Sequence, residues 1–252
     1  MGNRLENKIA LITGGAAGFG KGTAAVLKRE GAKVYISDIN KEGGEKVASE
    51  LGVSFFEHDV TDPERWQEVI AEIKTADNQL NILVNNAGIG YMGDVEGTTN
   101  EAWDLVHKVD LDSVFYGCKY ALPLMRDSGN GSIINISSIS ATRPKGYTSY
   151  SASKGAVISL TKAMAVDHGA DGIRVNCILP GPVYTPMVYQ DGMSEKLRKI
   201  RKDASLLNVE GDGFDIGKAV VYLSSNWAKY ITGQTLVVDG GCSLSYKSRG
   251  WY

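Results

Sequence analysis

The alternation of short apolar runs with helix-like segments is the feature that most limits how this chain can fold. Strand-like runs span Lys8–Thr13, Lys33–Ser37, Val53–Glu57, Leu80–Val84, Ser132–Ser137, Arg174–Ile178 and Thr235–Val238. Helical patterns lie between them. Because strands that are apolar throughout and joined by helices need cover on both faces, the pattern predicts a parallel sheet between two helical layers.

The helical patterns have recognisable ends. They cover Lys21–Glu30, Lys41–Leu51, 100–127 and 151–168, and a further helix is expected to start at Pro63 with Asp62 as its N-cap. The chain has 252 residues and no linker-like stretch or break in composition. We therefore predict one α/β domain over residues 1–252 with a doubly wound sheet.

Composition argues against several classes of protein. The formal net charge is −2 and there is no long basic run, so nothing favours a nucleic-acid or anionic-membrane partner. No apolar run approaches the roughly 18 residues that a membrane span needs, and the N-terminus lacks the pattern of a signal peptide. The three cysteines, Cys118, Cys177 and Cys242, indicate reduced thiols in a cytoplasmic protein. They form no ligand spacing with the histidines, so no metal is expected.

A glycine-rich loop follows the first strand-like run. Gly14, Gly18 and Gly20, with Phe19 between the last two, precede a helical pattern. Glycines allow the backbone to approach a pyrophosphate, and the helix N-terminus offers free N–H groups. This loop predicts a dinucleotide site, although a bare glycine triplet is also found in simple turns.

Asp38 ends the second strand-like run and is followed by Ile39. A carboxylate at this place can accept hydrogen bonds from the adenosine ribose and would repel the 2′-phosphate of NADP. Ala17, before Gly18, offers no positive charge for such a phosphate. The cofactor is therefore predicted to be NAD, with Ile39 beside it.

Further motifs occur in order along nearly the whole chain. They are Asp59-Val60, Asn85-Asn86-Ala87-Gly88, Ser138, Tyr150-Ser151-Ala152-Ser153-Lys154 and Pro180-Gly181-Pro182-Val183-Tyr184-Thr185. Together with the glycine loop, they closely resemble the classical short-chain dehydrogenase/reductase family. Each motif alone is weak, and their joint order is strong.

The resemblance implies a Rossmann-type sheet of seven parallel strands and a homotetramer. It also implies cofactor contacts at Asp59 and Val60 for the adenine, at Asn86, Ala87 and Gly88 along the groove, and at Pro180, Gly181, Val183 and Thr185 around the nicotinamide.

Tyr150 and Lys154 are four residues apart in a helical pattern, so both side chains lie on one helix face. An adjacent ammonium favours the phenolate, which allows the tyrosine to exchange a proton with an alcohol. Ser138 could hydrogen-bond the substrate oxygen. Lys154 could also bind the nicotinamide ribose. The expected reaction is hydride transfer between a secondary alcohol and the nicotinamide.

The chain departs from the family pattern in two places. The usual serine-to-tyrosine spacing selects Ser137, whereas the strand-end pattern selects Ser138, which we favour because a loop absorbs a deletion more easily than a buried strand. Asp110 stands where the family usually has a fourth catalytic residue, an asparagine. Its main chain could keep that role, while its carboxylate would oppose the effect of Lys154 on Tyr150 and shift the pH optimum. It could also be a structural aspartate at a helix bend.

The substrate is harder to predict. Tyr91, Met92, Tyr147 and the segment after Thr185 suggest an apolar pocket for a cyclic or aromatic alcohol. One alternative is a 3-oxoacyl-carrier-protein reductase, whose usual NADP preference does not fit Asp38. Another is a catalytically idle NAD-binding sensor or scaffold, which only Asp110 supports.

Overall fold

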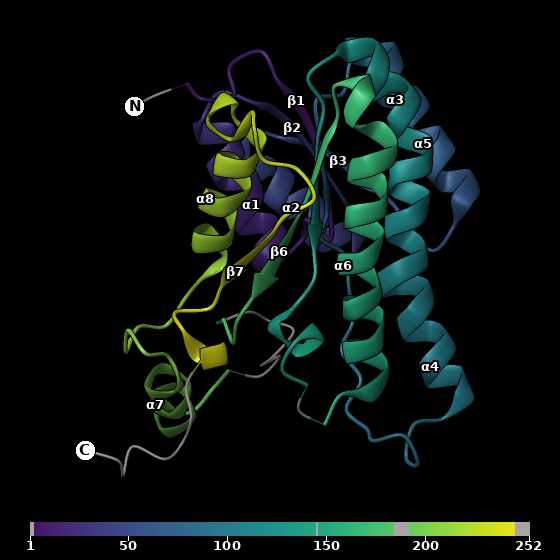
Figure 1. Ribbon diagram of the computed structural model, residues 1–252. Coiled ribbons are helices and arrows are strands. Elements are labelled where there is room, and N and C mark those ends of the chain that lie inside the picture. The colour runs from purple at the N-terminus through teal and green to yellow at the C-terminus, as the bar shows by residue number, and fades with distance from the viewer. Residues whose placement is uncertain (1–2, 145, 184–191, 245–252) are drawn as a thin grey trace.

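The protein is built on one sheet of seven parallel strands, seen in a computed structural model that describes residues 3–144, 146–183 and 192–244 (Figure 1). The strands are β1 Ile9–Thr13, β2 Lys33–Asp38, β3 Ser54–Glu57, β4 Ile82–Asn85, β5 Ser132–Ile136, β6 Arg174–Pro180 and β7 Thr235–Val238. Their order is β3-β2-β1-β4-β5-β6-β7, with every pair parallel. This confirms the predicted Rossmann-type α/β fold.

Helices cover both faces of the sheet. They are α1 Gly18–Arg29, α2 Lys41–Leu51, α3 Pro63–Asp77, α4 Asn100–His107, α5 Ser113–Ser128, α6 Thr148–His168, α7 Glu195–Ala204 and α8 Gly213–Ser224. Figure 1 shows α1, α2 and α8 on one side of the sheet and α3, α5 and α6 on the other. No helix in the described part of the chain is long and apolar enough to cross a membrane.

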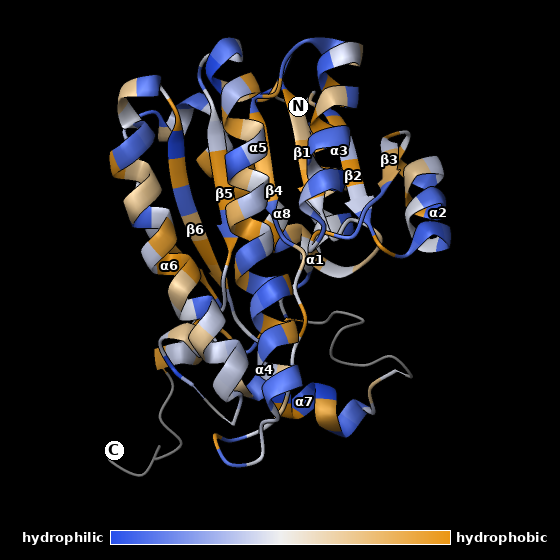
Figure 2. Ribbon diagram, turned by 90° about the vertical axis from the view of Figure 1, so that its right-hand side faces the viewer, coloured by the Kyte–Doolittle hydropathy of each residue, from blue (hydrophilic) through white to orange (hydrophobic). Residues whose placement is uncertain are grey.

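Two apolar cores follow from the alternation of side chains along each strand. On β1, Leu11 points into the core beneath α3, α5 and α6, whereas Ile12 points into the core beneath α1, α2 and α8. Figure 2 shows the central strands mostly in the hydrophobic colour. Because both faces are buried, these strands have no polar alternation, which explains why they were recognisable as continuous apolar runs.

The helix boundaries differ from the prediction at several places; α6, for example, begins at Thr148 rather than at residue 151. Two other differences matter more for the fold. First, α1 begins at Gly18 rather than Lys21. Second, the helical pattern over 100–127 is not continuous, because a π-helical turn, η1 Lys108–Asp112, separates α4 from α5. The sequence analysis also missed α8. Its N-cap, Asp212, accepts hydrogen bonds from the N–H groups of Phe214 and Asp215.

Candidate active site

The predicted site residues gather at one edge of the sheet. The glycine loop follows β1, and Asp38 ends β2. The other motifs follow β3, β4, β5 and β6. Because the strands are parallel, their carboxyl ends lie along the same edge, where ligands bind in open α/β sheets. The topology therefore brings together residues that are far apart in the sequence.

The glycines of the first loop are required by its shape. Gly14 and Gly18 have φ angles of 66° and 53°, in the left-handed region that favours glycine. A Cβ atom on Gly20 would lie 2.1 Å from the carbonyl oxygen of Gly14. The loop thus folds back tightly on the start of α1. Because its glycines have no side chains, a ligand's phosphates could approach the loop backbone directly.

Asn86 and Thr13 fasten this loop to the turn after β4. The Asn86 side-chain Nδ2 donates to the carbonyl oxygens of Thr13 and Gly14, at 2.7 and 3.1 Å. The Thr13 hydroxyl oxygen accepts from the backbone N–H groups of Asn86 and Ala87, at 3.0 Å each. Thr13 was missed by the sequence analysis, although a threonine at a strand end directly before a glycine loop is a usable signal.

The N-terminus of α1 carries no side-chain cap, since its N-cap residue is Ala17. By contrast, α2, α3, α4, α7 and α8 all begin with a side chain that accepts a backbone N–H. The first N–H groups of an uncapped helix attract anions. This end of α1 therefore fits the pyrophosphate of a dinucleotide.

The Asp38 carboxylate lies beside the loop. Its two oxygens accept the N–H groups of Ala16, at 3.0 Å, and Asn40, at 2.9 Å. The two nearby cations are engaged elsewhere, as Lys21 pairs with Glu50 and Lys41 with Glu57. Ile39 is 69% exposed, an apolar surface next to the carboxylate.

Other predicted cofactor contacts have their side chains engaged within the protein. Val60 is buried in the core, and its carbonyl oxygen accepts the indole N–H of Trp66 at 2.9 Å. The Asp59 carboxylate accepts the Thr61 N–H at 2.9 Å. Phe19 packs against the core beneath α1. Val60 and Phe19 could meet a cofactor mainly through their backbone.

The two candidate serines differ in their surroundings. Ser137 is buried and its hydroxyl donates to the carbonyl oxygen of Lys154 at 2.7 Å. Ser138 is half-buried, and its hydroxyl oxygen accepts the N–H of Ser140 at 3.1 Å. That contact uses an oxygen lone pair and leaves the Ser138 proton free to donate to a ligand.

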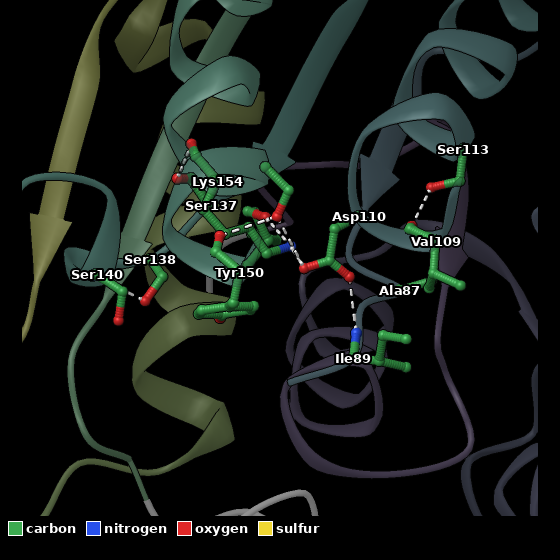
Figure 3. A network of polar contacts seen from close by, with 12 residues as sticks. Ala87, Ile89, Val109, Asp110, Ser113, Ser137, Ser138, Ser140, Tyr150 and Lys154 are labelled. Atoms are coloured by element: carbon green, nitrogen blue, oxygen red, sulfur yellow. Dashed lines mark hydrogen bonds and ion pairs between the residues drawn. The ribbon is translucent and has the colours of Figure 1, made fainter. Parts of the chain in front are cut away.

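Tyr150 and Lys154 share one face of α6. The Lys154 Nζ lies 5.6 Å from the centre of the Tyr150 ring, and in the view of Figure 3 the tyrosine lies between Ser138 and Asp110. Lys154 is 3% exposed. Its Nζ donates to the Ile136 carbonyl oxygen at 3.2 Å and pairs with Asp110 Oδ2 at 3.4 Å. Within the described residues, these two acceptors leave one ammonium proton for a ligand.

The π-helical turn brings Asp110 against Lys154. Asp110 is fully buried, and its Oδ1 accepts the Ile89 N–H at 2.8 Å (Figure 3). A Cβ on Gly88 would lie 3.1 Å from Lys154 Nζ and 3.3 Å from Asp110 Oδ1, a tight approach that a larger residue could make only if these side chains moved slightly. The structure therefore places the Asp110 carboxylate beside Lys154, within the π-helical turn.

Comparison with known proteins decides the family. A family model described as enoyl-(acyl carrier protein) reductase matches residues 14–243. Cyclopentanol dehydrogenase of Comamonas sp. (strain NCIMB 9872) is 38% identical over 244 residues, covering 94% of this chain and 98% of the relative. The chain belongs to the short-chain dehydrogenase/reductase family.

Two further relatives of this short-chain dehydrogenase cover it almost completely. The 2,5-dichloro-2,5-cyclohexadiene-1,4-diol dehydrogenase LinX of Sphingobium indicum is 40% identical over 253 residues, covering 97% of the chain and 99% of the relative. The 3-beta-hydroxysteroid dehydrogenase of Comamonas testosteroni is 40% identical over 250 residues, covering 95% and 97%. With such relatives, this protein is an oxidoreductase of the dehydrogenase type, and dehydrogenases of this family use nicotinamide cofactors.

Burial and charge act together on the two ionisable groups of this short-chain dehydrogenase site. Burial raises the pKa of Asp110 above its ordinary value, although the positive charge of Lys154 opposes that change. For Lys154, burial acts to lower the pKa, but the negative charge of Asp110 outweighs it and the pKa lies above the ordinary value. The lysine therefore keeps its positive charge at neutral pH.

The segment after β6 is described only in part. A Cβ on Gly181 would lie 2.5 Å from the Asp239 Cβ, so the chain passes closely there. The Val183 carbonyl oxygen accepts from Arg201 of α7 at 3.1 Å, a contact that no sequence motif indicated. The predicted contact Thr185 and residues 186–191 of the predicted pocket-lining segment lie outside the described residues.

Proposed function

We propose that this protein is an NAD(H)-dependent dehydrogenase that interconverts a secondary alcohol on a carbon ring and the corresponding ketone. The placement of Tyr150 and Lys154 on one helix face, with Ser138 at the end of the neighbouring strand, is the observation that carries this proposal. The names of the relatives support the substrate class, because cyclopentanol, a cyclohexadiene diol and a hydroxysteroid all bear the hydroxyl on a ring.

In the proposed reaction, each side chain handles one part of the chemistry. The Ser138 hydroxyl donates a hydrogen bond to the substrate oxygen and stabilises the negative charge that develops on it. Tyr150 takes the proton of the alcohol, or returns it to the ketone. The buried ammonium of Lys154 favours the phenolate and holds the ribose with its remaining proton. When bound in this groove, a nicotinamide cofactor would provide the hydride acceptor or donor.

Support for NAD over NADP comes from the surroundings of Asp38. Its carboxylate lies beside the glycine loop, where it would attract ribose hydroxyls and repel a 2′-phosphate. A 2′-phosphate needs a positive partner, and Lys21 and Lys41 already pair with Glu50 and Glu57. We expect kcat/KM with NAD to exceed that with NADP by about 100-fold.

We also propose a homo-oligomer, a tetramer, in the cytoplasm. Phe115 on α5 and Val237 on β7 are 49% and 44% exposed. Apolar side chains on these elements are suited to cover by another copy of the chain.

The test is a panel of cyclic alcohols and ketones, including a steroid and a 3-oxoacyl thioester, assayed with NAD(H) and NADP(H) side by side. Replacing Tyr150 by Phe should lower kcat by about 10³-fold and leave the Kd of NADH within about two-fold, because only the proton-transferring oxygen is lost.

Turnover of the thioester in preference to the cyclic ketones would favour the acyl-reductase alternative. NADH binding without turnover of any ketone would favour a sensor or scaffold. A Tyr150→Phe variant that keeps full activity would overturn the proposed mechanism.

A further inference from the structure

The Asp110–Lys154 pair changes the net charge of the site. In the family pattern, where asparagine usually stands at this position, the lysine ammonium would give the site a charge of +1. Here the Asp110 carboxylate lies 3.4 Å from Lys154 Nζ, and both side chains are buried. A lysine–carboxylate pair that holds a single proton has no net charge, whichever of the two groups carries that proton. Above the pKa of Asp110, the site therefore loses the positive charge that the lysine alone would give it.

The two redox forms of a nicotinamide differ in charge. The oxidised ring is positive and the reduced ring is neutral, so a nearby positive charge weakens binding of the oxidised form only. Lys154 is the residue proposed to hold the nicotinamide ribose, which brings its ammonium close to the ring. Because charges interact strongly in a buried site, a compensating carboxylate there affects the oxidised form selectively.

We propose that Asp110 makes the nicotinamide site favour binding of the oxidised cofactor over binding of the reduced one. This inference rests on the proposed function. Asp110 acts through Lys154 rather than by touching the substrate. It is therefore a positioning residue that acts through its charge, and the expected effect is a change in the ratio of the affinities for NAD⁺ and NADH.

Asp110→Asn is the variant that tests this proposal. An asparagine oxygen can still accept the Ile89 N–H, so the fold of the turn is retained while the negative charge is removed. The dissociation constant of NADH is measured by its fluorescence and that of NAD⁺ by competition. We expect the ratio Kd(NAD⁺)/Kd(NADH) to rise about ten-fold in the variant, since one buried unit charge has been lost.

Asp112→Asn provides the matched control. Asp112 lies two residues along the same π-helical turn, and the described residues give it no ion pair with Lys154. The same loss of charge at this position should leave the ratio within about two-fold.

A second measurement needs no variant. In the wild-type protein, the ratio should rise as the pH falls through the pKa of Asp110, which burial raises above its ordinary value, because protonation of the carboxylate removes the same charge. The other groups facing Asp110 are Ser153 and the Ile89 N–H, which do not titrate. Tyr150 and Cys177 face Lys154, and burial raises the pKa of Cys177 to about 11. Any effect that changes the binding of NAD⁺ and NADH equally, such as one at Asp38, cancels in the ratio of the two dissociation constants.

The outcomes separate the two proposals. If Asp110→Asn changes both dissociation constants by the same factor, or neither, the residue is only structural and the inference is overturned. An equal rise in the Asp112→Asn variant would also overturn it. If the wild-type protein binds neither NAD⁺ nor NADH, the proposed function itself fails.

Discussion

The two halves of the sheet's carboxyl edge treat buried charge in opposite ways. Beneath β2 and β3, His58 is buried against Ser37 and the edge of Trp66, with no carboxylate partner among the described residues. Burial and the positive charge of Arg65 lower its pKa to about 4, so it is neutral in the folded protein. Beneath β5 and β6, Lys154 is as deeply buried but faces Asp110, and its pKa is raised.

The difference teaches that burial alone does not decide whether a group keeps its charge. The unpaired His58 is neutral, whereas Lys154, with a carboxylate at ion-pair distance, keeps its charge, although burial still raises the pKa of that carboxylate. The half that would hold the adenosine and pyrophosphate combines backbone shape and a neutral histidine with the Asp38 carboxylate, which accepts backbone N–H groups. The half that would perform the chemistry relies on the Asp110–Lys154 pair.

After Tyr150→Phe, the largest effect in the chemical half is expected from Ser138→Ala. Removing a hydroxyl that donates to the substrate oxygen should lower kcat by about 10²-fold with little change in NADH binding. Ser137→Ala is the matched comparison. It removes a buried hydrogen bond to Lys154 and should lower the free energy of unfolding by about 1 kcal/mol while reducing kcat by less than about ten-fold.

Steady-state kinetics and urea unfolding on both serine variants check this contrast. If Ser137→Ala has the larger loss of kcat, the serine assignment is reversed.

Backbone shape in the other half is tested by Gly20→Ala. Because the new Cβ would lie 2.1 Å from the Gly14 carbonyl oxygen, the loop must shift, and NADH should bind about 30-fold more weakly. Gly169→Ala is the control. Its Cβ meets nothing within 4 Å, so both binding and folding should be preserved. Isothermal titration of NADH measures the difference, and equal affinities in the two variants would contradict the tight fit.

The last prediction concerns stability rather than turnover. The unfolded state binds a proton at His58 below pH 6.5, whereas the folded state does so only near pH 4, so stability is lost as the pH falls through this window. From pH 7 to 4.5, the free energy of unfolding should fall by about 2–3 kcal/mol more in the wild-type protein than in His58→Gln. Urea unfolding at both pH values measures this, and parallel losses would show that His58 contributes nothing.

The sequence predicted the elements that depend on local pattern. The apolar runs predicted the seven strands, with ends shifted by one or two residues. The glycine loop and the four-residue spacing of Tyr150 and Lys154 could be recognised because they too are local sequence patterns.

The features that the sequence could not predict depend on contacts between residues that are far apart in the chain. The start of α1 was placed too late because its glycines disfavour a helix, yet a Cβ on Gly22 would lie 2.4 Å from the backbone of Gly213 in α8. Close packing of two helices, rather than helix propensity, explains Gly22. Likewise, only the folded chain shows that the carboxylate of Asp110 faces Lys154.

The π-helical turn at Lys108–Asp112 has a consequence for how this stretch can evolve. Such a turn contains one residue more than an ordinary helical turn. Rewinding the segment into continuous α-helix without removing that residue would rotate everything after it by about 100°. Val114 and Cys118, which now face the core, would then turn away from it. The π-helical turn therefore lets this stretch hold one surplus residue while α5 keeps its apolar face on the core.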